Sequence, residues 1–341
     1  MSEVDRRRTN TAGMQLAELF YPGDEHKIRI ARQVGITHAF FNVSPILGSI
    51  DRDLYSGALR VVKSNLESAG LVFAGVESHP VPAEKIKLGL AGRDEEIENY
   101  IAAIRALSQL GVRLICYNWM GGLGWYRTQV NVAGRGGALV SEFRQSDAEK
   151  QGLTPWGQIS EKTIWDNLEY FLRAIIPVAE QHGVKMALHP DDPPISPLRG
   201  IGRILTSAES FRQVLRLMPS AANGITFCQA NFKLMGGDLT ALVREWCAQN
   251  KIFFVHFRDV AGTREHFVET FHDNGPTDLV RMLQTYHDCG FAGPIRPDHA
   301  PTLDGERNDR PGYSIGGKIL AIGYMKGIMD TLGIPYAKTT T

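Results

Sequence analysis

Short apolar runs alternate with longer amphipathic segments along most of the 341 residues. The apolar runs have the length of strands and lie at residues 14–19, 37–42, 71–77, 112–118, 184–188, 225–228, 251–256 and 294–298. The segments between them carry apolar residues at helical spacing, most clearly at 51–69, 93–110, 161–182, 206–217, 238–248, 277–288 and 317–332. With a charged helical segment that ends at Val34, the pattern predicts eight strands and eight helices in strict alternation.

This alternation predicts an α/β fold, the (β/α)8 TIM barrel, because parallel strands need helical crossovers and eight such units close. The alternative is an open doubly wound sheet, which would bind its ligand at one switch point. Polar groups here end nearly every strand from the third onward, which favours the barrel. No linker or repeat divides the chain, so we expect a single domain over residues 1–341. It would include a long loop at about 119–160 and a C-terminal helix and tail at about 317–341.

Charge and composition exclude several classes of partner. Lys plus Arg equals Asp plus Glu at 37 each, which argues against nucleic acid or an anionic membrane as partner. No apolar run approaches the ~18 residues of a membrane span, and the polar N-terminus lacks the apolar core of a signal peptide. The four widely spaced cysteines predict reduced thiols in a cytoplasmic protein. Barrels of this kind often associate, so a homo-oligomer is also an expectation.

Four of the strand-like runs end in a side chain that can bind a metal: His189, Cys228, His256 and Asp298. Taken singly, each has a structural interpretation, such as a satisfied core histidine or a small buried thiol. In a parallel barrel, however, the C-terminal ends of the strands converge on one face, so the four together predict a divalent-cation site. Two imidazoles, a thiolate and a carboxylate suit Mn²⁺, Fe²⁺, Co²⁺, Ni²⁺ or Zn²⁺, whereas Mg²⁺ and Ca²⁺ prefer oxygen ligands.

Other polar residues lie next to these strand ends. Arg127 and Arg258 are expected to bind a substrate carboxylate, and the alternative for both is a salt bridge at the barrel rim. Tyr117 and Asn118 end the fourth strand, where we expect them to contact substrate. Asp191 is expected to contact substrate or to support a metal ligand.

Three further side chains complete the expected site. His299 directly follows Asp298, and Tyr313 follows in a Pro-Gly-Tyr turn, so both are candidates for acid–base chemistry. Glu77 ends the third strand, and we expect it to orient a neighbouring basic side chain. Asp192 is interpreted equally well as a support for the ligands or as a turn cap.

Several runs resemble the D-mannonate dehydratase family. They are ESHPVPAEKIKLGLAGRDEEIENY (77–100), CYNWM with WYRT (116–128), ALHPDDPP (187–194), NGITFC (223–228), VHFRDV (255–260), and RPDH with PGY (296–299 and 311–313). The similarity extends from the first strand to the last helix. The chain differs from the usual family pattern at 121–124, 229–231, Asp259 and Ala300, all near the expected substrate.

The resemblance implies a xylose isomerase-like TIM barrel and a Mn²⁺-dependent hydro-lyase of hexuronate catabolism. Its reaction would convert D-mannonate into 2-keto-3-deoxy-D-gluconate and water. Carried over motif by motif, the metal would bind His189, Cys228, His256 and Asp298, with His299 and Tyr313 as catalytic residues. The alternatives are a dehydratase of another aldonic or uronic acid, a sugar isomerase or epimerase of the same superfamily, and a binding protein on a retained barrel.

Overall fold

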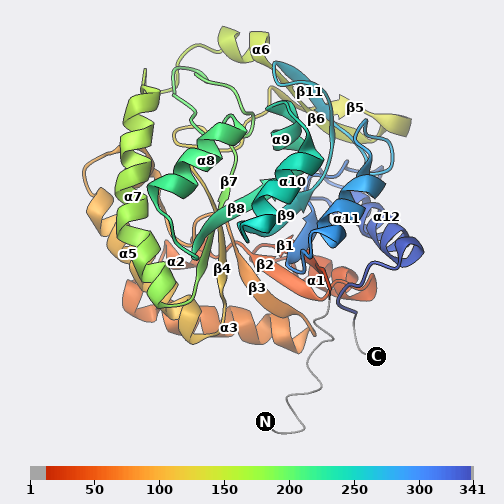
Figure 1. Ribbon diagram of the computed structural model, residues 1–341, viewed down its shortest axis with the longest axis horizontal. Helices are drawn as coiled ribbons and strands as arrows, with labels where there is room; N and C mark the ends of the chain where they lie inside the picture. Colours follow the sequence, from red (N-terminus) through yellow and green to blue (C-terminus); the bar gives the residue numbers. More distant parts are fainter. Residues whose placement is uncertain (1–12, 339–341) are drawn as a thin grey trace, which may run out of the picture.

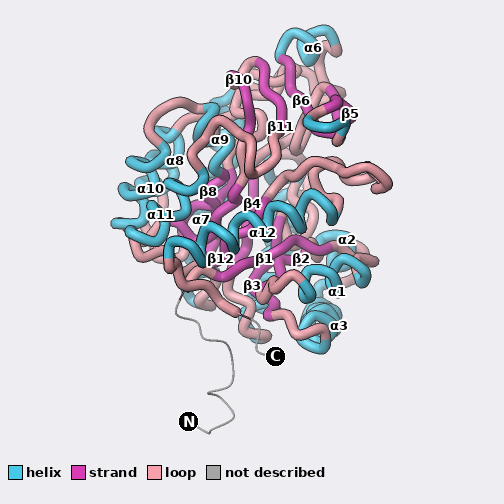
Figure 2. Tube along the Cα trace, turned by 90° about the vertical axis from the view of Figure 1, so that its right-hand side faces the viewer, coloured by secondary structure: helices cyan, strands magenta, loops and turns pink. Residues whose placement is uncertain are grey.

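The computed structural model describes residues 13–338, and in this part of the chain eight parallel strands close into a barrel (Figures 1 and 2). Neighbouring strands follow the order β1-β12-β9-β8-β7-β4-β3-β2. Their bounds are β1 Gln15–Phe20, β2 His38–Phe41, β3 Val72–Glu77, β4 Leu114–Asn118, β7 Lys185–His189, β8 Asn223–Cys228, β9 Ile252–Phe257 and β12 Pro294–Pro297. The predicted TIM barrel is confirmed, and each of the eight strands lies where the hydrophobic pattern placed it.

The predicted helices surround the barrel. They are α1 Glu25–Gln33, α3 Tyr55–Ser68, α5 Arg93–Gln109, α7 Glu161–Gln181, α8 Ala208–Leu217, α10 Leu239–Ala248, α11 Leu279–Asp288 and α12 Ile315–Leu332. Polar N-caps fix several starts: the Ser207 hydroxyl accepts from the Ser210 N–H, and the Asp238 carboxylate accepts from the Thr240 and Ala241 N–H groups. The predicted strict alternation is wrong in detail. Short helices interrupt it, namely α2 Ser44–Leu47, α4 Glu84–Leu88, α6 Gln145–Lys150 and α9 Gln229–Leu234, with 3-10 turns η2 Arg52–Leu54 and η3 Arg135–Gly137.

A second, antiparallel sheet was not predicted. The segment expected as a long loop contains β5 Gln129–Ala133 and β6 Leu139–Arg144. These pair with a hairpin after β9, formed by β10 Val260–Thr263 and β11 His266–Glu269, in the order β10-β11-β6-β5. Figure 2 shows this sheet above one end of the barrel. Because β4 and β9 lead into it by their C-terminal ends, the sheet lies on the side where the candidate ligands converge.

The barrel interior is filled by aromatic and small residues. The rings of Phe40 and Phe254 stack at a centroid distance of 3.9 Å. Gly75 makes this packing feasible, because a Cβ at Gly75 would lie 2.6 Å from the Phe40 ring. The barrel centre is therefore solid, and the space for a ligand lies above it at the strand C-terminal ends.

None of the helices within residues 13–338 combines the length and the apolar character that crossing a bilayer requires.

Candidate metal centre and active site

The four predicted ligands converge at the C-terminal ends of adjacent strands. His189 ends β7, Cys228 ends β8, His256 lies in β9, and Asp298 directly follows β12. One ligand atom from each side chain lies within 4.8 Å of the others, and all four residues are buried. The strands β12, β9, β8 and β7 are consecutive neighbours in the barrel, which explains how residues more than 100 positions apart meet.

The chemistry of this cluster fits a divalent cation. Both ring nitrogens of His256 are buried without a hydrogen-bond partner, a costly state that a metal ligand would relieve. The Nδ1 of His189 lies 2.7 Å from the Pro190 carbonyl oxygen, so Nδ1 carries the proton and Nε2 keeps its lone pair for a ligand. Burial lowers the pKa of His189 to about 4, and burial with the Arg296 charge holds the pKa of His256 well below its ordinary value. Both imidazoles are therefore neutral and able to ligate.

The other two ligands differ in their protonation. Burial raises the pKa of the Cys228 thiol to about 12, so a bound cation would have to displace its proton. Burial also opposes ionisation of Asp298, but the charges of His299, Arg296 and other neighbours outweigh it and hold the pKa of this carboxyl well below its usual range. Arg258 Nε lies 2.9 Å from Asp298 Oδ2, and Arg296 Nη2 lies 2.8 Å from Oδ1. Asp298 is thus a fixed anion.

Glu77 contacts a basic side chain, as its position at the end of β3 suggested. Its carboxylate accepts hydrogen bonds from Nε of Arg296, at 2.9 Å, and from Nη2 of the same residue. Its Oε1 also lies 3.4 Å from His256 Nε2. Burial raises the pKa of Glu77 and the Arg296 charge opposes the rise. Glu77 therefore links the ligand cluster to a buried arginine.

Arg127 and Arg258 are engaged in a buried network with two carboxylates. Arg127 Nη1 lies 2.6 Å from Asp192 Oδ1, and its Nη2 lies 2.7 Å from Glu269 Oε1. Arg258 Nη2 lies 2.6 Å from Asp192 Oδ2, and its Nη1 lies 2.7 Å from Glu269 Oε1. The side chains of both arginines are 0% exposed, and neither residue lines the pocket beside the cluster. Their contacts match the salt-bridge alternative, and a role in binding substrate stays a prediction.

Asp191 lies away from the pocket as well. It is fully buried, accepts a hydrogen bond of 2.8 Å from the Leu205 N–H, and lies 3.3 Å from Arg203 Nη1. These contacts fix the segment after β7. Support for the adjacent ligand His189 is consistent with this position, whereas direct contact with substrate is not favoured by it.

His299 and Tyr313 lie together at the pocket. His299 Nε2 is 3.2 Å from the Tyr313 hydroxyl, and His299 Nδ1 is 3.1 Å from Glu269 Oε1. Burial and the Asp298 charge raise the pKa of Tyr313 well above 10, so its hydroxyl keeps its proton. Glu269 is a site residue that the sequence interpretation missed. It lies in β11, one of the strands that the hydrophobic pattern did not reveal.

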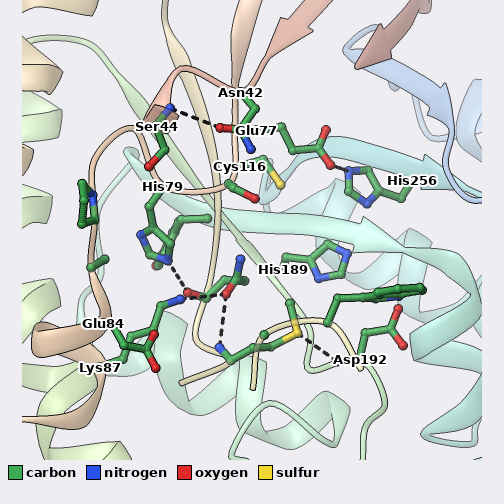
Figure 3. Close-up of a pocket in the computed structure, with 18 of the residues that line it drawn as sticks. Asn42, Ser44, Glu77, His79, Glu84, Lys87, Cys116, His189, Asp192 and His256 are labelled. Carbon is green, nitrogen blue, oxygen red and sulfur yellow. Dashed lines mark hydrogen bonds and ion pairs between the residues drawn. The ribbon is translucent and has the colours of Figure 1, made fainter. Parts of the chain in front are cut away.

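A pocket of about 410 Å³ lies beside the cluster, a volume within the roughly 300–1,000 Å³ usual for small-molecule sites. Its wall includes the candidate ligands His189 and His256 (Figure 3). The candidate ligand Asp298 and the candidate catalytic residues His299 and Tyr313 line it too. Tyr117 and Asn118 also line it, as predicted. The lining residues without a predicted role include His79, whose Nε2 lies 2.7 Å from the Asn118 carbonyl oxygen, and Lys87. Both lie in the run 77–100, where the polar residues could have indicated a pocket wall.

Known proteins resemble the chain over nearly its whole length. The model of the family D-mannonate dehydratase (UxuA) matches residues 26–155 and 150–338. "Mannonate dehydratase 2" of Halalkalibacterium halodurans is 34% identical over 344 residues, covering 92% of this chain and 97% of the relative. A mannonate dehydratase of Streptococcus agalactiae is 34% identical over 301 residues, covering 80% of this chain and 86% of the relative.

Solved structures agree with these sequence matches. The crystal structure of mannonate dehydratase from Streptococcus suis superposes with a TM-score of 0.85 at 29% identity, covering 96% of this chain and 98% of the other. A 3-keto-D-glucoside 4-epimerase from E. coli has a TM-score of 0.60 at 13% identity, covering 92% and 99%, which shows a shared fold alone. With a family match across both halves and relatives at 34% identity, the chain belongs to the D-mannonate dehydratase family.

Proposed function

We propose that this protein is a metal-dependent hydro-lyase that converts D-mannonate into 2-keto-3-deoxy-D-gluconate and water. Membership of the D-mannonate dehydratase family supports this reaction. The observation that carries the proposal is the gathering of four buried ligand groups within 4.8 Å of one another, beside a pocket that also contains a hydrogen-bonded His-Tyr pair. We further propose that the reaction takes place in the cytoplasm, where the free thiols of the four cysteines would stay reduced.

The proposed cofactor is Mn²⁺, held by His189, Cys228, His256 and Asp298. The ligand set would also accept Fe²⁺, Co²⁺, Ni²⁺ or Zn²⁺. When bound, such a cation supplies Lewis acidity toward the carboxylate and the C2 hydroxyl of the substrate. The protein's own contribution is a set of ligands whose protonation and orientation are fixed by burial and by neighbouring charges.

The reaction removes a proton from C2 and a hydroxide from C3. The two leave as water, and the enol that remains becomes the 2-keto acid when C3 takes up a proton. The chain therefore needs a base at C2 and an acid at the C3 hydroxyl. His299 and Tyr313 are the two groups of the pocket whose contacts suit these roles.

We assign His299 as the base and Tyr313 as the acid. Burial opposes ionisation of Glu269, but the charges of Arg258 and Arg127 hold the pKa of Glu269 below its usual value. As an anion, Glu269 accepts a hydrogen bond from the Nδ1–H of a neutral His299. The Nε2 lone pair, 3.2 Å from the Tyr313 hydroxyl, can then take up the C2 proton. Tyr313 keeps its proton because its pKa is raised, so it can donate to the departing hydroxyl.

Turnover of D-mannonate by the Mn²⁺-loaded protein tests the reaction. We expect a 2-keto-3-deoxy product from D-mannonate and none from neutral sugars such as aldoses or ketoses. If a neutral sugar is isomerised or epimerised and no six-carbon acid is dehydrated, the proposal is wrong. Release of a 2-keto product from another aldonic or uronic acid in preference to D-mannonate would reject the substrate and keep the reaction class.

Hydrogen exchange at C2 in D₂O tests the division of roles between the two side chains. We expect Tyr313→Phe to lose dehydration but still exchange the C2 hydrogen with solvent, because the base remains. His299→Ala should lose both. Exchange that survives in His299→Ala and disappears in Tyr313→Phe would reverse the assignment.

A further inference from the structure

Lys87 is the one lysine or arginine among the described residues that line the pocket. It lies in the short helix α4 and is buried, with its Nζ 3.1 Å from Asn118 Oδ1. Within residues 13–338, no carboxylate oxygen lies within 4.0 Å of this Nζ. Each buried arginine described above has a carboxylate partner, so the Lys87 ammonium differs from all of them.

A buried ammonium without a counter-ion is costly, because the charge loses its hydration. Burial lowers the pKa of Lys87 to about 8, helped by the charge of Arg203 and opposed by Glu84, Asp191 and Glu96. The side chain therefore stays mostly protonated at neutral pH. A polar ligand in the pocket would supply the hydrogen-bond acceptors that the protein does not.

The wall around Lys87 has the polarity needed for several hydroxyl groups. The Tyr117 hydroxyl, the His79 Nδ1 and the Trp125 Nε1 are buried without a hydrogen-bond partner, and all three residues line the same pocket. Glu84 lines it too and offers a carboxylate acceptor. In Figure 3, Lys87 and Glu84 lie on one side of the pocket, and His189 and His256 lie on the other.

We propose that Lys87 binds the hydroxyl oxygens at C5 and C6, at the tail of the sugar acid, and so sets a preference for six-carbon over four-carbon substrates. This inference rests on the proposed function, which sets the orientation of the substrate in the pocket. The carboxylate is bonded to C2, and C2 must lie beside the ligand cluster and the His299–Tyr313 pair, so the rest of the carbon chain extends toward Lys87.

Binding of unreactive analogues tests this assignment without requiring turnover. A six-carbon 3-deoxy aldonic acid and 2,4-dihydroxybutanoate, its four-carbon counterpart, have no C3 hydroxyl to lose. We expect calorimetric titration of the Mn²⁺-loaded protein to show tighter binding of the six-carbon acid. Lys87→Met should weaken that binding about 10- to 100-fold, as for a lost charge-assisted hydrogen bond, and change four-carbon binding less than about threefold.

Lys85→Met is the matched control, because Lys85 lies in the same helix but is exposed and does not line the pocket. It should leave both affinities unchanged. Lys87→Met should fold, because Asn118 Oδ1 still accepts from the Met120 N–H at 3.2 Å and an isolated buried charge is removed. Lys87→Arg should recover part of the six-carbon affinity.

Three results would overturn the assignment. Lys87→Met could weaken the binding of both acids equally, it could weaken the binding of neither acid, or the unmutated protein could bind both acids with the same affinity. Equal weakening would mean that Lys87 contacts the carboxylate end. The proposed reaction is judged separately by turnover of D-mannonate. Lack of turnover with the expected binding pattern would reject the reaction and retain the role of Lys87.

Discussion

Replacing Arg127 by Met distinguishes a structural from a substrate-binding arginine. The guanidinium of Arg127 contacts Asp192 and Glu269 at 2.6 and 2.7 Å and donates to the Tyr126 carbonyl oxygen at 2.9 Å. It also lies 4.7 Å from the centroid of the Trp125 ring. Methionine fills much of the same space but leaves Asp192 and Glu269 to share Arg258 alone. A neutral group of four charges thereby becomes a buried net anion.

The size of the stability loss in Arg127→Met follows from the burial of Asp192 and Glu269. Breaking a buried ion pair on one side costs about 3–5 kcal/mol, because a charge is left uncompensated. At about 2 °C per kcal/mol for a chain of this size, Tm should fall by roughly 6–10 °C. Arg144→Met is the control, since Arg144 is 43% exposed and its contact with Glu142 is 3.0 Å. A pair of that kind contributes about 0–1 kcal/mol.

The difference in stability between the wild type and Arg127→Met should become smaller as the pH falls. The pKa values of Asp192 and Glu269 lie below their ordinary values of 3.8 and 4.5, although burial opposes this, because the arginine charges outweigh it. A carboxyl with a lowered folded pKa stabilises the protein above its ordinary pKa and loses that contribution as the pH falls through the folded pKa. The difference in Tm should therefore be full above about pH 5 and shrink as the pH falls below 4.

Thermal melts from pH 3 to pH 7, with KM measured for D-mannonate at neutral pH, complete the test. We expect a large loss of Tm for Arg127→Met, a small one for Arg144→Met, and a KM within about threefold of wild type, because Arg127 does not line the pocket. An unchanged Tm with a KM raised about 100-fold would refute the structural role and support substrate binding.

Other predictions concern the metal centre. His256→Ala should lose bound metal with little loss of fold, whereas the control His182→Ala, at the C-cap of α7, should retain it. Elemental analysis of both purified proteins measures the bound metal. Full metal occupancy in His256→Ala would show that His256 is not a ligand. Removal of metal by a chelator should lower Tm, with recovery on adding Mn²⁺, because a ligand that binds the folded state stabilises it. Glu77→Gln should weaken metal affinity about 10- to 100-fold through His256, and a metal titration that gives wild-type affinity would contradict this.

The positions of the four candidate ligands could be predicted from the sequence because the C-terminal ends of the strands in a parallel barrel lie close together. His189, Cys228, His256 and Asp298 each follow a run of apolar residues that is recognisable by itself. Once eight such runs alternate with helices, the convergence of their C-terminal ends follows from the topology. No knowledge of side-chain contacts is needed for this step.

The partners of the charged residues could not be predicted in the same way. Glu269 contacts Arg127 across 142 positions, and its strand β11 is a four-residue segment that forms only by pairing with β10 and β6. Such a strand carries too few residues for a periodic signal, and its partner β6 lies in a segment that appeared to be a loop. The sequence alone therefore left open whether Arg127 and Arg258 bind substrate or form salt bridges.

Arg258 and Arg296 also account for the ionised state of Asp298, and their contacts are compatible with its proposed role as a metal ligand. A carboxylate offers about four lone-pair positions, and Arg258 and Arg296 contact one oxygen each. Oδ1 also accepts a hydrogen bond of 3.5 Å from the Tyr313 hydroxyl, so a position for a cation remains on Oδ2. Because both arginines are buried and have further carboxylate partners, they hold Asp298 ionised and oriented before any metal arrives. The charges of Arg258 and Arg296 are thus paired with carboxylates inside the protein. Among the described residues that line the pocket, Lys87 is the one that carries a lysine or arginine charge.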